Sequence, residues 1–220
     1  GFSIITQADS SIFPDNIRDK LDIIQNGVTN SFNKKNGTVW KDKEYDIIFT
    51  GNMSYHPNVQ ACKYLVKKVL PLIKEELNGK ICLVGTNPVQ EVLNLQSQNV
   101  IVTGFVEDIK TWLARSKIYV APLFSGSGLQ NKLLESMAMG LPTLTTSFSN
   151  YALKAKDEHE ILLCDNEKVF AEKIKFLLNN SNIAEKIGRK GKKFVTNNYK
   201  WTECNQILEN AFKNIALQID

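Results

Sequence analysis

The chain has 220 residues, of which 43% are apolar and 23% are charged. This length and balance support one folded domain with additional segments, and they exclude two complete Rossmann-type domains, a disordered chain and a fibrous repeat. The net charge of +4 is spread along the chain rather than gathered in one stripe, so we expect no nucleic acid as a partner.

The spacing of the cysteines and the length of the apolar runs indicate the expected cellular location of the protein. The four cysteines are far apart and form no CxxC pair, so neither a zinc site nor a disulfide framework is indicated, and a reducing, cytoplasmic location is expected. The longest apolar run, residues 118–124, is far shorter than the roughly 20 residues of a membrane helix. A basic cluster at residues 186–193 is typical of a solvated helix face, and contact with anionic lipid is the alternative.

The first 43 residues do not have the pattern of the rest. Short strand-like runs occur at residues 3–6 and 22–25, Asn26-Gly27 then predicts a turn, and residues 28–43 are polar enough to be a loop. Because the chain starts on Gly1 and enters an apolar run at once, we expect that a part of the protein precedes it.

From Tyr45 onward, short apolar runs alternate with helical stretches. Six buried strands are predicted at residues 46–49, 81–84, 100–102, 118–120, 142–144 and 161–163. Helices are predicted at residues 57–77, 89–96, 108–116, 131–139, 166–179, 182–198 and 201–217. This alternation predicts an α/β fold, a Rossmann-like doubly wound parallel sheet of about six strands with helices on both faces.

In such a sheet, ligands bind beyond the carboxyl ends of the strands. The loop Gly126-Ser127-Gly128-Leu129 enters a predicted helix there, and its glycines permit a phosphate to approach the backbone N–H groups at the positive end of the helix dipole. Lys132 would add a point charge to the same anion. The alternative is that the two glycines only form a turn.

Glu135 lies one turn beyond Lys132 on a helix that is otherwise largely apolar. A half-buried carboxylate needs a partner, and the two hydroxyl groups of a ribose would provide one, as in dinucleotide sites. A structural ion pair with Lys132, three residues earlier, is the alternative.

At this stretch the sequence resembles a known family. Residues 121–123, 126–128 and 132–142 resemble the donor-site segment of retaining GT-B glycosyltransferases of the "glycosyl transferases group 1" family. Further similarity lies in Ile24-Gln25-Asn26-Gly27-Val28, in residues 50–58, in residues 102–108, and in Tyr199-Lys200-Trp201 before the last helix. The resemblance covers nearly the whole chain.

The resemblance implies one half of a GT-B fold, with the active site in a cleft between two Rossmann-like domains. Residues 1–43 would be the end of a preceding domain and the interdomain linker, residues 44–200 the nucleotide-sugar-binding domain, and residues 201–220 a helix that crosses back to the missing N-terminal domain. Glu135 would hold the ribose, the amides of Gly126, Ser127, Gly128 and Leu129 the phosphates and the sugar, and Phe105 with Val106 the base. A nucleotide-sugar, UDP- or GDP-linked, would be the donor substrate, with no required metal or cofactor and with retention at the anomeric carbon.

Two positions depart from the family pattern. Many members carry a Glu eight positions before the one matching Glu135, where this chain has Ser127. Many also carry an Arg and a Lys after the first core strand, whereas residues 51–58 contain neither. Asn52 and His56 remain as donor-site candidates in that loop, and His56 is its one side chain that could become cationic near neutral pH.

Two other function classes share this fold. A sugar-nucleotide epimerase half-domain would need a catalytic set in the cleft, and a non-catalytic, receiver-type binding domain would need acidic residues after the first core strand, where Thr50-Gly51-Asn52 has none. The expected role of a glycosyltransferase is in polysaccharide or glycoconjugate biosynthesis, with the full enzyme in the cytoplasm or peripheral at the inner face of the membrane. Its acceptor-side catalytic residues would lie outside this chain.

Overall fold

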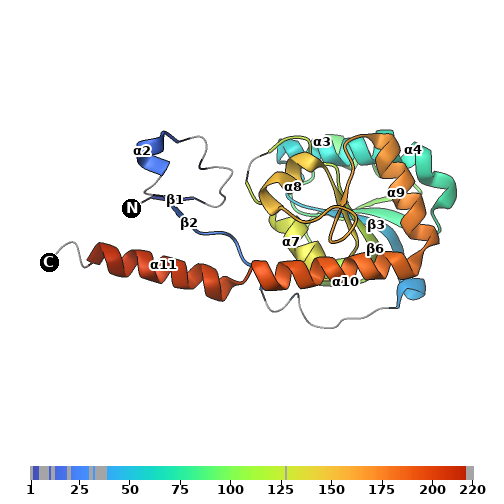
Figure 1. The fold of residues 1–220 in the computed structure, drawn as a ribbon. Coiled ribbons are helices and arrows are strands. Elements are labelled where there is room, and N and C mark those ends of the chain that lie inside the picture. The colour runs from blue at the N-terminus through green and yellow to red at the C-terminus, as the bar shows by residue number, and fades with distance from the viewer. Residues whose placement is uncertain are drawn as a thin grey trace.

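The computed structural model describes residues 2–4, 10, 13–18, 21–29, 32, 39–126 and 128–216. Its centre is a six-stranded sheet in which every neighbouring pair is parallel (Figure 1). The strands are β3 (Tyr45–Thr50), β4 (Lys80–Val84), β5 (Val100–Val102), β6 (Ser116–Ala121), β7 (Thr143–Thr145) and β8 (Leu162–Leu163). All six predicted strands are confirmed.

The strand order is β5-β4-β3-β6-β7-β8. The chain therefore moves outward from β3 to β5 and then returns to the other side of β3 with β6. Where the direction reverses, the crossover helices lie on opposite faces and a crevice opens at the carboxyl ends of the strands. All six residues of β3 are buried, because helices cover this central strand on both faces.

Helices surround the sheet, with α3, α4 and α9 on one side and α7 and α10 on the other (Figure 1). They are α3 (His56–Tyr64), α4 (Leu70–Ile73), α5 (Gln90–Leu93), α6 (Ile109–Ala114), α7 (Asn131–Ala138), α8 (Ser147–Leu153), α9 (Glu167–Asn179) and α10 (Ser181–Asn198). The predicted doubly wound sheet with helices on both faces is confirmed.

The helix predicted at residues 57–77 is interrupted. After α3 comes a π-helical turn, η3 (Leu65–Val69), then α4 and the 3-10 turn η4 (Lys74–Glu76). Pro71 has no N–H to donate to the carbonyl four residues earlier, and the N–H of Leu70 bonds the carbonyl of Leu65, five residues back. The proline therefore accounts for the change of helix type.

Helix α8 was not predicted. Its large apolar residues do not face the core: Phe148 and Tyr151 are 52% and 70% exposed, and only Ser149 and Leu153 are buried. The helix starts instead at a local cap, where the hydroxyl of Thr146 accepts a hydrogen bond from the N–H of Ser149 at 3.2 Å.

The N-terminal elements lie apart from the six-stranded sheet, near α11 (Trp201–Ala216) (Figure 1). They are β1 (Phe2–Ile4), α2 (Asp15–Arg18) and β2 (Leu21–Ile23), with β1 and β2 paired in parallel. A 3-10 turn, η2 (Trp40–Asp42), follows within the segment predicted as a loop. The division into domains at residues 43 and 200 stays a prediction.

The predicted turn at Asn26-Gly27 is wrong, since the chain is extended there and pairs with the start of α11. Val28 donates its N–H to the carbonyl of Tyr199 at 2.8 Å and forms a parallel bridge with Lys200. A Cβ atom on Gly27 would lie 2.5 Å from the backbone nitrogen of Trp201. Gly27 is therefore required by close packing rather than by a turn.

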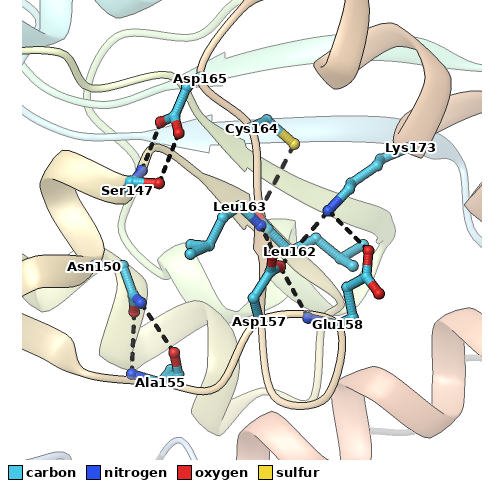
Figure 2. A network of polar contacts seen from close by, with 10 residues as sticks. All are labelled: Ser147, Asn150, Ala155, Asp157, Glu158, Leu162, Leu163, Cys164, Asp165 and Lys173. Atoms are coloured by element: carbon cyan, nitrogen blue, oxygen red, sulfur yellow. Dashed lines mark hydrogen bonds and ion pairs between the residues drawn. The ribbon is translucent and has the colours of Figure 1, made fainter.

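Polar contacts hold the outer edge of the sheet at β8 (Figure 2). Asp157 accepts a hydrogen bond from the N–H of Leu163 at 2.8 Å, and its carboxylate lies 3.6 Å from the ammonium of Lys173 on α9. Asp165 accepts two hydrogen bonds from Ser147, from the N–H at 2.8 Å and from the hydroxyl at 2.7 Å. Both adjacent helices, α8 and α9, are thereby anchored to a strand of only two residues.

Helix α10 packs closely on the amino end of the sheet through two glycines. Gly188 is buried against the carbonyl of Gly140, and a Cβ on Gly191 would lie 2.6 Å from the carbonyl of Glu160.

The helices that the structure describes do not include one with the length and the apolar composition needed to span a membrane.

The glycine contact predicts an unusual effect on stability. Gly188→Ala should destabilise the fold by about 1–3 kcal/mol, because the added methyl group overlaps the Gly140 carbonyl, although alanine is the better helix former. For a chain of this length, each kcal/mol lowers the Tm by about 2–4 °C, measurable by thermal unfolding. The control, Asn197→Ala at an exposed position of α10, should leave the Tm unchanged or raise it slightly. A Gly188→Ala variant as stable as the control would contradict the contact.

Candidate functional site

The loops that follow β3 and β4 are joined by backbone hydrogen bonds at the carboxyl edge of the sheet. The N–H of Gly51 donates to the carbonyl of Val84 at 3.1 Å, and the N–H of Met53 donates to that of Thr86 at 2.7 Å. These bonds fix the two loops relative to each other, so they form one wall of the crevice between β3 and β6.

A pocket of ≈ 270 Å³ opens at this edge, beside the reversal of the strand order. It combines an apolar wall with two oppositely charged side chains of α7, Lys132 and Glu135. The apolar wall consists of Val84, Phe105, Val106 and Ile109. Four residues predicted for the site, Phe105, Val106, Lys132 and Glu135, therefore come together, and Phe105 presents a ring that is 74% exposed.

Lys132 lines this pocket and is half-buried. Its ammonium donates to the side-chain oxygen of Asn58 and lies 5.3 Å from the centre of the Phe49 ring. Burial lowers the pKa of Lys132 to about 8, against the smaller opposing effects of Cys62 and Glu135. Among the described residues, Lys132 therefore has one hydrogen-bond partner. It is positively charged at neutral pH and loses its proton as the pH rises through about 8.

The carboxylate of Glu135 differs from Lys132 in its contacts. Among the described residues, none lies within hydrogen-bond or ion-pair distance of it, so the structural pair with Lys132 is not formed. Burial raises the pKa of Glu135, and the charge of Lys132 opposes that rise. Its acceptor oxygens are thus available to a ligand with hydroxyl donors.

The glycine loop before α7 has the backbone that its sequence requires. Gly126 and Gly128 both have positive φ, +113° and +70°, a region that favours glycine. Leu129 is buried and anchors the loop, whereas Ser127 lies outside the described residues. The positive φ angles explain the glycines by conformation alone, because a Cβ on Gly126 would make only ordinary van der Waals contacts, the nearest at 3.7 Å from Gln130 and Tyr55.

The start of α7 is also connected to the N-terminal segment. Asn131, the first residue of the helix and part of the pocket lining, accepts a hydrogen bond from the side-chain amide of Asn26 at 2.9 Å. The extended segment after β2 therefore reaches the rim of the pocket.

Asn52, in the loop after β3, and His56, at the start of α3, lie outside the residues that line the pocket. The side chain of Asn52 accepts hydrogen bonds from the N–H and the hydroxyl of Ser54, at 3.0 and 2.8 Å. His56 is exposed at the first position of α3, with its Nε2 atom 3.4 Å from the amide nitrogen of Gln60. No contact joins either side chain to Lys132 or Glu135 among the described residues.

The residue that does join this loop to Lys132 is Asn58, for which the sequence predicted no separate role. Its only signal was its place beside His56 and Pro57 in a segment that resembles the family. Burial to 3% exposure and the contact with Lys132, 74 residues later, appear only in the folded chain.

The model of one protein family, described as "Glycosyl transferases group 1", matches residues 44–180, more than half of the chain. The chain belongs to the glycosyl transferases group 1 family. The matched region contains the whole six-stranded sheet and both charged residues of the pocket.

Curated relatives of this group 1 chain are about twice its length. It is 25% identical over 186 residues to a Campylobacter jejuni GalNAc-α-(1->4)-GalNAc-α-(1->3)-diNAcBac-PP-undecaprenol α-1,4-N-acetyl-D-galactosaminyltransferase, covering 80% of this chain and 49% of that protein. It is 22% identical over 178 residues to an uncharacterised 44.6 kDa protein of the Klebsiella pneumoniae cps region, covering 76% of this chain and 45% of that protein. The chain thus spans about half the length of these relatives.

Solved structures show the same fold. A point mutant of S. aureus TarM, in complex with fondaparinux, α-GlcNAc-glycerol and UDP, has a TM-score of 0.76 at 18% identity, over 97% of this chain and 43% of that one. Anabaena Alr3699/HepE with UDP and glucose has a TM-score of 0.72 at 13% identity, over 96% of this chain and 62% of that one. The fold of this group 1 domain is therefore the GT-B half expected from the sequence.

The pocket electrostatics of the group 1 domain can be measured without a ligand. An NMR titration of ¹³C-labelled lysine side chains should show Lys132 titrating near pH 8, about two pH units below ordinary lysines. Glu135→Gln should lower this pKa further, because it removes a nearby negative charge that favours the protonated form. Lys43, whose pKa burial also lowers to about 8, is the control, assigned through Lys43→Arg and expected to be unaffected by Glu135→Gln. An ordinary lysine pKa for Lys132 would contradict its burial.

Proposed function

We propose that this chain is the nucleotide-sugar-binding half of a GT-B glycosyltransferase that transfers a sugar to an acceptor with retention at the anomeric carbon. Because the chain spans only part of its relatives, the acceptor side would be supplied by an N-terminal domain of the same polypeptide. Family membership and the fold support this proposal, and the pocket at the strand reversal supports it most directly.

One feature of the pocket carries the assignment: a cation, a carboxylate with no direct partner among the residues that the structure describes, and an apolar wall occur together within ≈ 270 Å³. A nucleoside diphosphate has three matching parts. Its diphosphate suits Lys132 and the amides at the start of α7, its ribose hydroxyls suit Glu135, and its base suits Phe105 and Val106.

Chemically, the site would act on the leaving group. As the bond from the anomeric carbon to the diphosphate breaks, negative charge develops on the phosphate oxygens. Lys132 and the Gly126 to Leu129 backbone, Ser127 included, would stabilise that charge more strongly in the transition state than in the bound donor. In this proposal no metal ion is required, because the protein supplies the positive charge.

Uridine is the base we favour over guanine. Two structures with this fold, those of TarM and HepE, are complexes with UDP, and this supports the choice.

The proposed place of action is the cytoplasmic face of the membrane, in polysaccharide or glycoconjugate biosynthesis. The Campylobacter relative is named for an undecaprenol-linked substrate, and the Klebsiella relative for a cps region. In this chain, α10 exposes Lys186, Arg189 and Lys193, which suits peripheral contact with anionic lipid, although Arg189 also lies 3.5 Å from Glu185.

A sugar-nucleotide epimerase half-domain would bind the same ligand, so nucleotide binding does not separate it from a transferase. No feature of the described pocket favours it, and the family match favours transfer. Transfer of radiolabelled sugar to a lipid-linked acceptor, or epimerisation of the free donor, by the full-length polypeptide would decide between them.

Nucleotide binding by the 220-residue chain is the first test. In a thermal-shift panel of UDP, GDP and ADP, the preferred ligand at 100 times its Kd should add about 2.7 kcal/mol of stability. That corresponds to a Tm rise of roughly 5–10 °C for a domain of this size. The shift should be the same with EDTA as with Mg²⁺. If none of the three nucleotides shifts the Tm at millimolar concentration, the assignment fails, and a shift that EDTA abolishes would overturn the metal-free reading.

The role of Glu135 is tested by calorimetry with two ligands. Glu135→Gln should weaken UDP binding by roughly 1.5–3 kcal/mol, about 10- to 100-fold, because a charged hydrogen-bond acceptor becomes a neutral amide. For the 2′,3′-dideoxy analogue the loss should be much smaller, since its hydroxyl donors are already absent. Equal losses for both ligands would show that Glu135 does not contact the ribose.

A further inference from the structure

In the described part of the chain, two groups from two different elements contact the ammonium of Lys132. They are the side chain of Asn58 from the first turn of α3 and the Phe49 ring from β3, whereas Glu135, one turn further along α7, acts on Lys132 through its charge without a direct contact. Only Asn58 forms a hydrogen bond with it among the described residues, and it does so through its side-chain oxygen. A neutral amide therefore holds the cation of the pocket.

The orientation of the Asn58 amide is determined by its other contacts. Its Nδ2 atom donates to the carbonyl of Asn52 at 2.8 Å, and this nitrogen lies 2.7 Å from where a Cβ of Gly51 would be. Because Nδ2 must face a carbonyl oxygen, Oδ1 faces Lys132 and the amide cannot flip without losing both bonds. The side chain is 3% exposed, so water does not compete for either bond.

We propose that Asn58 is a positioning residue, which holds the Lys132 ammonium toward the diphosphate subsite. Through Asn58, the segment after β3 takes part in donor binding although this segment contains no cationic Arg or Lys. This inference rests on the proposed function. It accounts for a loop that contains neither Arg nor Lys between residues 51 and 58, yet packs directly against the pocket.

The amide has an advantage over a carboxylate at this position. A carboxylate would form an ion pair with Lys132 and neutralise the charge that a diphosphate needs, whereas an amide leaves the full charge available. The other titratable groups facing Lys132 are Glu135 on α7 and the buried thiol of Cys62 on α3, whose pKa burial raises to about 12, so Cys62 is neutral at physiological pH. Lys132 thus keeps a net positive charge at neutral pH and loses it as the pH rises through about 8.

A double-mutant cycle with UDP tests the coupling. Lys132→Met should weaken UDP binding by roughly 10- to 100-fold and Asn58→Leu by about 3- to 10-fold, because the second change leaves the ammonium in place but no longer held. In the Lys132→Met background, Asn58→Leu should have little further effect. Losses that multiply in the double variant would overturn the proposal. Asn58→Ser is measured in parallel, because its smaller side chain removes the amide without adding a bulky apolar group. Thermal unfolding verifies that each variant is folded.

The pH profile separates positioning from a purely structural role. From about pH 7.5 to about pH 8.5 the charge of UDP is nearly constant, because its last phosphate pKa is about 6 and the uracil N3–H ionises only at higher pH, so a change in affinity in this range reports on the protein. Wild-type affinity should fall as the pH rises through about 8, and Asn58→Asp should move that fall to higher pH while weakening binding at pH 7. A profile unchanged by Asn58→Asp would contradict the proposal.

A matched asparagine elsewhere serves as the control. Asn150 on α8 also uses both ends of its amide, bonding the carbonyl and the N–H of Ala155 at 2.9 and 3.0 Å (Figure 2). Asn150→Leu should lower the Tm and leave both the UDP affinity and its pH profile as in the wild type. An equal loss of affinity in this control would show that general destabilisation, not the contact with Lys132, explains the Asn58 variants.

The last measurement distinguishes failure of this inference from failure of the proposed function. If the wild-type chain binds no nucleotide, the proposed function fails. The Lys132 pKa of the free protein, measured by NMR in Asn58→Leu, still tests the contact: it should be lower than in the wild type, because a hydrogen bond to the charged form is lost. If the wild type binds UDP but this pKa does not change, Asn58 does not hold the ammonium.

Discussion

The adjacency of β3 and β6 is the constraint on which the site depends. Because the chain winds outward in one direction from β3 and in the other from β6, the connections leave on opposite faces and cannot cover the carboxyl edge between them. Helix α3 begins on one side of this gap and α7 on the other. Asn58 and Lys132, 74 residues apart in the chain, meet across it.

Desolvation shifts the pKa values of the two charged residues of the pocket. Burial lowers the pKa of Lys132 and raises that of Glu135, so the pocket disfavours the charged form of both residues. A domain optimised for stability alone would pair these charges or replace them with apolar residues. A ligand that carries both an anion and hydroxyl donors would satisfy them together, and this is the basis of the binding role that we propose for the pair.

The chain that precedes the sheet is part of the same arrangement. Its extended segment pairs with the junction between α10 and α11 through Val28, packs on Trp201 through Gly27, and reaches the rim of the pocket through Asn26. The segment thus contacts both the start of α11 and the start of α7.

The sequence by itself determined the six strands, most of the helices, and the presence of Phe105, Val106, Lys132 and Glu135 at one edge, because these follow from apolar period, glycine loops and family resemblance. It failed where local signals conflict with packing: the large apolar residues of α8 do not face the core, and Asn26-Gly27, which indicates a turn, is extended against Trp201. Only the tertiary structure decided which partners the charges have. Whether Glu135 pairs with Lys132 or is left to a ligand, and whether Asn58 holds that lysine, depends on distances between elements far apart in sequence. Such distances are fixed by the packing of β3, α3 and α7, and no short sequence pattern encodes them.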